Sequence, residues 1–290
     1  MSRHRSGSVV VGVDGSRSAS DAVAWAAAEA ALTGVPLRLV AALGPPLARR
    51  TDDGDLEEAS GRHLVVSADA ALDMATEQAT REHDGIVVDR EARQGFAVPV
   101  LVDESLHATL LVTGSRGLGG VPGLLLGSVS TAVAAKAECP VVVVRGARRS
   151  PGDDRPVVVG VDGSEISDPA VELAFAAASE RGVPLIAVHT WSDQMLVQLG
   201  PIVDMDAINA DERHLLSQRL AGWREKYPEV EVRTVVRRDK PAQVLQELSA
   251  NAQLLVVGTR GRGRVSGLLL GSVGHALLHT AECPVLVARS

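Results

Sequence analysis

The chain has 290 residues and a formal net charge of −7, and 46% of its residues are hydrophobic although only 2% are aromatic. The acidic balance argues against a broad nucleic-acid surface, and no apolar run reaches the roughly 18 residues that a membrane span needs. The N-terminal residues lead into an apolar strand without the hydrophobic region of a signal peptide, so we expect a cytoplasmic protein.

The first half alternates short apolar runs with helix-like segments. Val9–Ser16, with the sequence VVVGVDGS, predicts a first strand that ends at Asp14. Four more strands are expected near residues 37–42, 86–92, 109–113 and 141–145. The runs are built from Val, Leu and Ala, as is typical of strands that are buried on both faces of a parallel sheet.

The second half follows the same plan. Its strands are expected at Pro156–Val161, Pro184–His189, Val230–Val236, Leu254–Val257 and Pro284–Ala288. Its helices are expected from Ser167 or Asp168 to Arg181, from about Val203 to Tyr227, over Pro241–Asn251, and from Ser272 to about Ala281, with Gly182 ending the first of them. The alternation predicts an α/β fold with two tandem five-stranded parallel sheets, each covered by helices on both faces.

The two halves are copies of one domain. VVVGVDGS recurs at Val157–Ser164, and the closing phrase CPVVVVR at Cys139–Arg145 recurs as CPVLVAR at Cys283–Arg289. A repeat of this length is the size of a whole domain rather than of a solenoid unit. We therefore expect one domain over residues 1–146, a charged linker rich in Gly and Pro over 147–155, and a second domain over 156–290.

A glycine-rich loop follows the fourth strand of each half. Residues 114–130 have the sequence GSRGLGGVPGLLLGSVS, and residues 258–274 have the sequence GTRGRGRVSGLLLGSVG. Glycines in such a loop allow backbone amides to converge on an anion, and the helix that begins next presents its positive dipole end. Arg116 and Arg260 each offer a cation to the same anion. The loops therefore predict a phosphate-binding site in each half.

Two familiar phosphate motifs do not fit these loops. A Walker loop needs a lysine that neither copy contains, and the dinucleotide GxGxxG follows the first strand, which here ends in VDGS. The alternative interpretation is that the glycines only make turns. Because duplication alone explains the second copy, the repeat does not exclude this alternative.

The aspartates that end the first strands are placed to face these loops. Ligands of parallel α/β sheets bind at the carboxyl ends of the strands, where the strand order reverses. If the first and fourth strands are neighbours, Asp14 faces the loop at Gly114 and Asp162 faces the loop at Gly258. We state this placement as a hypothesis for the structure to test.

The chain resembles the universal stress protein family, in its ATP-binding subclass. The pattern G-x2-G-x9-G-[S/T] of that family occurs at Gly114, Gly117, Gly127 and Ser128, and again at Gly258, Gly261, Gly271 and Ser272. The resemblance covers about residues 9–145 and 156–289. It implies a Rossmann-like fold related to the adenine-nucleotide α-hydrolases, and ATP that is bound without efficient hydrolysis.

The resemblance also implies which residues contact the nucleotide. Asp14 and Asp162 would lie against the adenine or ribose and could help to hold Mg²⁺ through the phosphates, and the exit of the second strand (Ala41–Gly44 or His189–Asp193) would complete the adenine pocket. The expected binding residues of the first half are Gly12, Asp14, Gly114, Ser115, Arg116, Gly117, Leu118, Gly119, Gly120, Gly127, Ser128, Val129 and Ser130. Those of the second half are Gly160, Asp162, Asp193, Gly258, Thr259, Arg260, Gly261, Arg262, Gly263, Arg264, Gly271, Ser272, Val273 and Gly274.

The halves differ around their loops. The second contains the family-like segment DKPAQVLQELS at Asp239–Ser249, whereas RQGFAVPVLVDES at Arg93–Ser105 is a weaker match, and Gly44–Gly61 is acidic and unusual. We therefore favour the second domain for ATP binding. The family also implies that the fifth strands of the two domains pair within the chain, and we expect a homodimer.

No catalytic set is visible in the sequence. The histidines lack the HExxH spacing of a zinc site, and no GxSxG elbow is present. His275 and the equivalent cysteines, Cys139 and Cys283, are interpreted as structural residues. The leading hypothesis is an ATP-binding regulatory module of the bacterial stress response with no enzymatic role. The alternatives are a slow ATPase or adenylate-transferring hydrolase, and a ligand-free scaffold.

Overall fold

The computed structural model describes residues 7–44, 55–118, 126–146, 153–164, 167–191, 205–259 and 270–289, with no side chains described for 55–63 and 205–207. The chain divides into two compact units, Met1–Arg148 and Arg149–Ser290. Each unit is an α/β domain with five parallel strands, as the alternation of the sequence predicts. No helix of the described residues is long and apolar enough to span a membrane.

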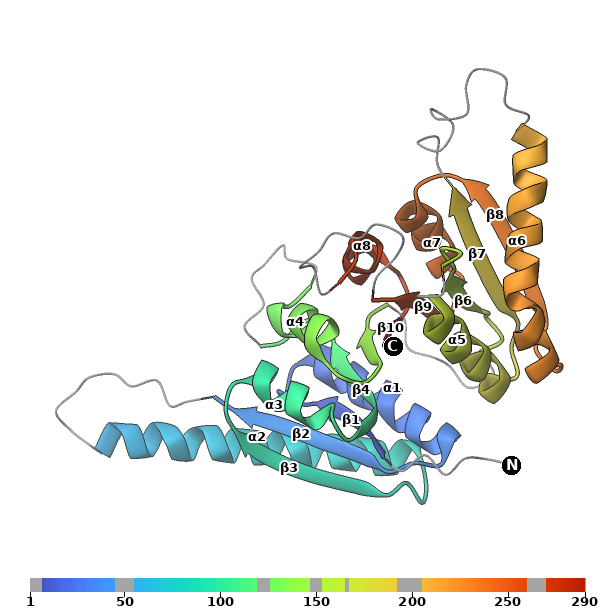
Figure 1. The fold of residues 1–290 in the computed structure, drawn as a ribbon. Coiled ribbons are helices and arrows are strands. Elements are labelled where there is room, and N and C mark those ends of the chain that lie inside the picture. Colours follow the sequence, from blue (N-terminus) through green and yellow to red (C-terminus); the bar gives the residue numbers. More distant parts are fainter. Residues whose placement is uncertain are drawn as a thin grey trace. The chain divides into compact units, whose positions relative to one another are not determined.

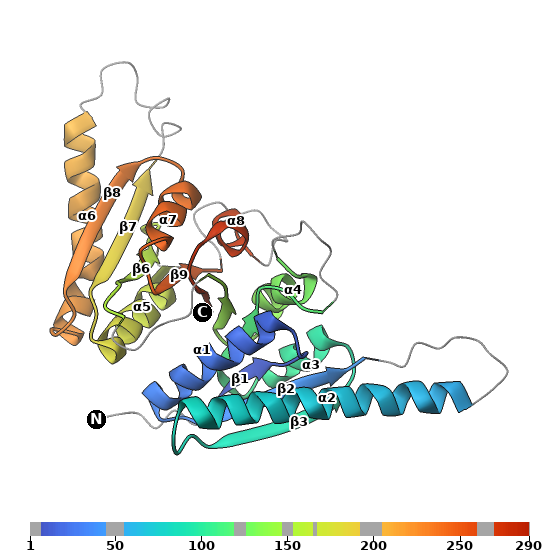
Figure 2. The same ribbon diagram turned by 180° about the vertical axis from the view of Figure 1, so that it is seen from behind.

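The first unit has the strand order β3-β2-β1-β4-β5 (Figure 1). Its strands are β1 (Ser8–Gly12), β2 (Leu37–Leu43), β3 (Val88–Gln94), β4 (Ala108–Gly114) and β5 (Val141–Val144). Its helices are α1 (Arg17–Thr33), α2 (Asp55–Glu82), α3 (Ala97–Glu104) and α4 (Ser128–Lys136). Helices α3 and α4 pack together on one face of the sheet (Figure 1), and α1 and α2 cover the other (Figure 2).

The second unit repeats this order as β8-β7-β6-β9-β10. Its strands are β6 (Val157–Gly160), β7 (Leu185–Trp191), β8 (Val232–Arg238), β9 (Leu254–Gly258) and β10 (Val285–Ala288). Its helices are α5 (Asp168–Arg181), α6 (Met205–Lys226), α7 (Pro241–Ser249) and α8 (Ser272–Thr280). Gly182 ends α5 in the left-handed conformation, with φ 63°, as predicted.

Small and aliphatic side chains make the cores. The middle residues of β1, β4 and β5 are almost completely buried valines and leucines, and one face of α1 is lined by alanines that let the helix lie close to the sheet. The second unit also has an aromatic cluster, in which Phe175 of α5 stacks on Trp223 of α6 and on Tyr227, which directly follows α6. Cys139 and Cys283 are buried and form no disulfide bond, which agrees with their interpretation as structural residues.

A network of charged side chains fixes α3 against β2 and β3 in the first unit. Arg38 of β2 donates to Glu104 of α3 at 2.7 Å and also pairs with Asp89 and Glu91 of β3. Arg93 of β3 donates to the same Glu104, at 2.7 Å. The Glu104 side chain is only 9% exposed, so the network is partly removed from water. Its position matters for the site because Leu101 of α3 lines the cavity described below.

The second unit has an apolar version of this network. The strand register places Ile186 where the first unit has Arg38, and Val235 where it has Glu91. The ends of the equivalent helices α3 and α7 place Leu248 where the first unit has Glu104. All three apolar side chains are half-buried. The second unit keeps the ion pair between this strand and helix, as Arg237 and Glu247 at 2.9 Å, but has apolar residues at the positions of Arg38, Glu91 and Glu104.

The network predicts that the first unit is sensitive to acid. Hydrogen bonds from Arg38, followed by those from Arg93, lower the pKa of Glu104. A lowered pKa in the folded state stabilises the fold above the ordinary glutamate value of about 4.3, and this stabilisation is lost as pH falls through the folded pKa. Below about pH 4.3 we therefore expect the first unit to lose more of its free energy of unfolding than the second.

Urea unfolding at a series of pH values measures this difference. The fluorescence of Trp25 reports unfolding of the first unit when Trp191 and Trp223 of the second unit are replaced by Phe. A variant in which Trp25 is replaced by Phe reports unfolding of the second unit. A Glu104→Gln variant should remove most of the difference between the units. An equal loss of stability in the two units of the parent chain would contradict the prediction.

Candidate functional site

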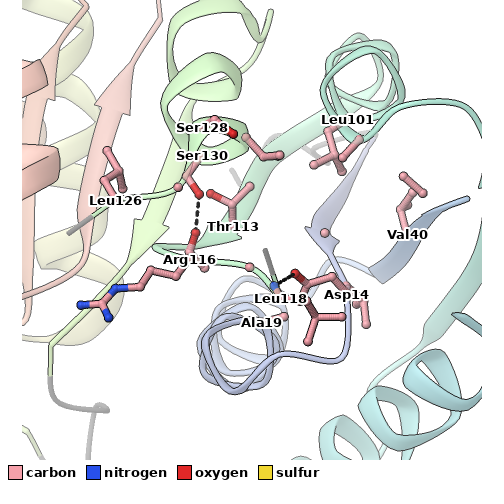
Figure 3. Close-up of a pocket in the computed structure, with 18 residues that line it drawn as sticks. Asp14, Ala19, Val40, Leu101, Thr113, Arg116, Leu118, Leu126, Ser128 and Ser130 are labelled. Carbon is pink, nitrogen blue, oxygen red and sulfur yellow. Dashed lines mark hydrogen bonds between the residues drawn. The ribbon is translucent and has the colours of Figure 1, made fainter. Parts of the chain in front are cut away.

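A cavity of about 380 Å³ opens in the first unit where β1 and β4 end. The two strands are parallel neighbours, as the switch-point hypothesis requires. The cavity is lined by Gly12, Val13, Asp14, Ala19, Val40, Ala42, Ala97, Leu101, Thr113, Gly114, Arg116, Gly117, Leu118, Leu126, Gly127, Ser128, Val129 and Ser130. These residues come from β1, β2, β4, α1, α3, α4 and the described part of the glycine loop (Figure 3).

Asp14 faces the glycine loop across the mouth of this cavity. One carboxylate oxygen accepts a hydrogen bond from the backbone N–H of Ser16 at 2.9 Å, and the other accepts from the N–H of Leu118 at 3.1 Å (Figure 3). The first contact shapes the turn that precedes α1, where Ser16 caps the helix by accepting from Ala19. The predicted juxtaposition of Asp14 and the loop is confirmed in the first unit.

Two glycines of the loop lie against neighbouring parts of the chain. A Cβ atom on Gly114 would lie 2.5 Å from the carbonyl oxygen of Ser18, and one on Gly117 would lie 2.6 Å from the Asp14 carboxylate. Both distances are shorter than any ordinary contact. For Gly114, which faces backbone, the alternative that the glycine serves the turn is therefore sufficient. A side chain at Gly117 would instead displace the Asp14 carboxylate, which lines the cavity.

Gly127 differs from these two glycines. Its φ of −78° and ψ of 150° suit any residue, and the nearest atom to a Cβ there would be the Ser115 carbonyl oxygen at an ordinary 3.5 Å. The residue stands at the N-cap of α4, makes no side-chain capping bond and lines the cavity. The protein leaves open, at a helix N-terminus, a space that a side chain could occupy.

The two serines in the first turn of α4, Ser128 and Ser130, lie in different surroundings. Ser130 is buried, and its hydroxyl donates to the Gly114 carbonyl at 2.6 Å, which ties the helix to the end of β4. Ser128 is exposed at the cavity. The amides of the first helical turn have no intrahelical partner, so this end of α4 is the most favourable place in the cavity for an anion.

Two predicted residues of the loop lie differently from the rest. Ser115 does not line the cavity, and its hydroxyl lies 3.4 Å from that of Ser18 on α1. Arg116 lines the cavity, and its backbone N–H donates to the Ser18 hydroxyl at 3.2 Å. Its guanidinium extends away from Asp14 and Leu101 (Figure 3). A cationic role for Arg116 therefore requires its side chain to turn.

The wall opposite α4 is apolar. It is formed by Val40 and Ala42 at the end of β2 and by Ala97 and Leu101 of α3. The sequence identified the exit of the second strand as Ala41–Gly44, but Ala41 points away, since alternate residues of a strand face opposite sides of the sheet. Alternation along β2 would have selected Val40 and Ala42, whereas nothing in the sequence identifies Ala97 or Leu101 as cavity residues.

The second unit shows the same framework in its described part. β6 and β9 are parallel neighbours, and Gly271 has φ −67° and ψ 158° at the N-cap of α8. Its N–H donates to the Thr259 carbonyl at 2.7 Å, as that of Gly127 does to Ser115. One Asp162 oxygen accepts from Ser164, and the other is buried with no hydrogen-bond partner among the described residues.

The exit of β7 differs from its interpretation in the sequence. His189 is buried, with Nδ1 donating to the Val161 carbonyl at 2.7 Å and Nε2 lying 2.9 Å from a Glu212 oxygen on α6. Trp191 likewise donates from Nε1 to Asn209 of α6, at 3.2 Å. Both side chains are thus engaged with α6. Among the described residues of this strand exit, Thr190 is the one on the opposite face of the sheet, at the position that Ala42 has in the first unit.

Part of the predicted set lies outside the described residues. These are Gly119 and Gly120 in the first unit, and Asp193, Arg260, Gly261, Arg262, Gly263 and Arg264 in the second. Within the described residues, no cluster of three or more His, Cys, Asp or Glu side chains could hold a metal ion.

Comparison with known proteins gives consistent matches over the whole chain. The model of the universal stress protein family matches residues 6–145 and again 155–289. A universal stress protein of Mycobacterium bovis is 43% identical over 289 residues, which cover 97% of this chain and 96% of the relative.

Solved structures also match. The crystal structure of a universal stress protein from Archaeoglobus fulgidus superposes with a TM-score of 0.72 at 19% identity, covering 98% of this chain and 99% of that one. A universal stress protein solved in complex with cAMP is 30% identical over 48% of this chain and 97% of its own, with a TM-score of 0.37.

Proposed function

We propose that this chain, which belongs to the universal stress protein family, binds ATP in the cavity of its first unit and in the corresponding place of its second. The adenine lies against the apolar wall of Val40, Ala42 and Leu101, and the phosphates lie at the N-terminus of α4. The protein holds the nucleotide with little or no hydrolysis and acts as a regulatory module of the stress response.

Gly127 carries this proposal. Neither its backbone conformation nor the space around it requires a glycine, yet the position is left without a side chain at the N-terminus of α4. A phosphate at that place would use the unpaired amides of the helix and would need the space that a Cβ would fill. Asp162 supports the second site, because its buried oxygen without a described partner suits a donor group of a bound ligand.

The titratable side chains of the cavity favour holding over hydrolysis. Among the described lining residues these are Asp14 and Arg116. Both oxygens of Asp14 already accept backbone N–H groups, which leaves the carboxylate poorly placed to activate a water molecule as a general base. A regulatory role follows if ATP binds two conformations of the protein with different affinity.

Incubation of nucleotide-free protein with ATP labelled on the γ-phosphate tests the proposal. We expect the chain to retain intact ATP for hours at 37 °C after rapid gel filtration, with less than one turnover per site. Native mass spectrometry of the same sample counts the nucleotides bound per chain and shows whether the chain forms a dimer. The homodimer and the pairing of the fifth strands both stay predictions.

The other outcomes of this experiment are equally clear. Steady release of phosphate over many turnovers would identify a slow ATPase instead. Retention of neither ATP nor cAMP would contradict nucleotide binding and leave a ligand-free scaffold. Competition by cAMP without retention of ATP would keep the site and change the ligand.

A further inference from the structure

Helix α8 carries two histidines that lie side by side. His275 and His279 are four residues apart, and residues at this spacing are neighbours on the surface of an α-helix. The centres of their rings are 4.9 Å apart, and the ring planes are inclined by 40°. No other two histidines of the chain have this spacing. The helix thus brings together two imidazole rings, each with a nitrogen that can bind a metal ion.

The distance between the two rings suits a shared metal ion. A zinc ion about 2.1 Å from one nitrogen of each imidazole, at a tetrahedral angle, places the two ring centres about 5 Å apart. The observed separation of 4.9 Å agrees with this value. The rings therefore already have the separation that a shared ion requires, and rotation about the side-chain bonds can aim one nitrogen of each ring at it.

The sequence around the pair is also related to a metal motif. Residues 275–279 have the sequence HALLH, which contains the two histidines of the zinc motif HExxH but not its glutamate. The expectation that the histidines lack the HExxH spacing is therefore wrong for this pair. Among the described residues no third His, Cys, Asp or Glu completes the site. Without the glutamate, which acts as the general base in zinc proteases, the pair is suited to holding an ion rather than to hydrolysis.

The fold does not require a histidine at either position. The equivalent helix of the first unit, α4, also has nine residues, and it carries Thr131 and Ala135 where α8 carries His275 and His279. The buried residues of α8 are Gly274, Leu277 and Leu278. His275 is exposed and His279 is half-buried, so both lie on the flank of the helix outside the core. The histidines are therefore an addition to the second unit that its packing does not explain.

The flank that carries the histidines differs from the face that lines the nucleotide cavity. In the first unit Ser128, Val129 and Ser130 of α4 line the cavity, whereas Thr131, at the position of His275, does not. By this equivalence the histidine pair lies outside the proposed nucleotide site of the second unit. A metal ion bound there would be separate from any ion that accompanies the phosphates.

The two imidazoles select the class of ion. Neutral imidazole binds Zn²⁺, Cu²⁺ and Ni²⁺, whereas Mg²⁺ and Ca²⁺ take oxygen ligands. We infer that His275 and His279 together bind one divalent transition-metal ion on the flank of α8. This site goes beyond the proposed function and does not depend on nucleotide binding. Because the imidazoles must be deprotonated to bind a metal, the affinity falls in acid.

Titration calorimetry with Zn²⁺ on the full-length chain, without an affinity tag, tests the site. We expect one Zn²⁺ per chain, and an excess of Mg²⁺ should not compete with it. His275→Ala and His279→Ala should each weaken Zn²⁺ binding at least about tenfold, since even the loss of an outer partner of a ligand costs a metal site that much. His214→Ala is the matched control and should leave the affinity unchanged, because His214 is an exposed histidine of α6 with no histidine three or four residues away.

Electron paramagnetic resonance of the Cu²⁺ complex identifies the ligands. We expect two nitrogen ligands from the parent chain and no more than one from either alanine variant. The metal-free variants should melt close to the parent temperature, because neither histidine belongs to the core. A purely structural role would instead lower that temperature and leave the Zn²⁺ affinity unchanged. Equal Zn²⁺ affinity of the parent chain and both alanine variants, or no binding of Zn²⁺ by the parent chain, would show that the inference is wrong.

Discussion

Replacing Gly127 by glutamate is expected to weaken ATP binding at the first site by at least about a hundredfold, or 2.7 kcal/mol. The new carboxylate would stand at the N-terminus of α4, where the phosphates are proposed to lie. Two like charges about 4 Å apart near a protein surface repel by roughly 4 kcal/mol, which exceeds the required loss. The number of ATP molecules that native mass spectrometry counts per chain should fall by one.

The same substitution should leave the fold intact. The backbone of Gly127 has an ordinary conformation, its Cβ has room, and an acidic side chain is favourable at a helix N-terminus. Gly127→Gln is the matched control, since it has the size of glutamate without the charge and should weaken ATP binding less. Gly127→Glu that binds ATP as tightly as the parent chain would show that the phosphates do not lie at α4.

The order of the elements could be predicted from the sequence because parallel strands are buried on both faces. Most strands, such as Val141–Val144 and Leu254–Gly258, are continuous apolar runs that begin and end within two residues of their expected bounds. β3 was expected over residues 86–92 and lies at Val88–Gln94. Its residues are charged and largely exposed, and the apolar run at residues 86–88 that predicted its start begins two residues before the strand does.

The roles of the loop glycines could not be separated from the sequence. Gly114, Gly117 and Gly127 belong to one spacing pattern, and the pattern gives them equal weight. The structure separates them through contacts with Ser18 and Asp14, which lie about a hundred residues earlier in the chain and reach the loop only when β1 and β4 are neighbours.

The preference for the second domain rested on local sequence similarity. The weaker segment of the first half nevertheless forms α3, and its Leu101 is a wall of the cavity. What made Arg93–Ser105 look unusual is in part Asp103 and Glu104, which bind Arg93 and Arg38. The segment that matches the family less well therefore still supplies a wall of the cavity in the first unit. The relative affinities of the two sites stay a prediction.

The charged network of the first unit leads to the second large prediction. Replacing Arg38 alone by isoleucine, the residue of the second unit, should lower the free energy of unfolding of the first unit by about 2 kcal/mol. The substitution leaves Glu104, which is only 9% exposed, with Arg93 as its remaining cation. A buried charge that loses part of its compensation costs more than the ion pair contributed.

Converting the whole network to the apolar version should restore that stability. The triple variant Arg38→Ile, Glu91→Val, Glu104→Leu reproduces Ile186, Val235 and Leu248, which stand at the same positions of the second unit. We expect its free energy of unfolding to lie within about 1 kcal/mol of the parent chain, because apolar residues often replace buried ion pairs without loss. Urea unfolding reported by Trp25 measures both variants. If the triple variant is less stable than Arg38→Ile alone, the charges themselves hold α3 in place, and the equivalence of the two solutions is wrong.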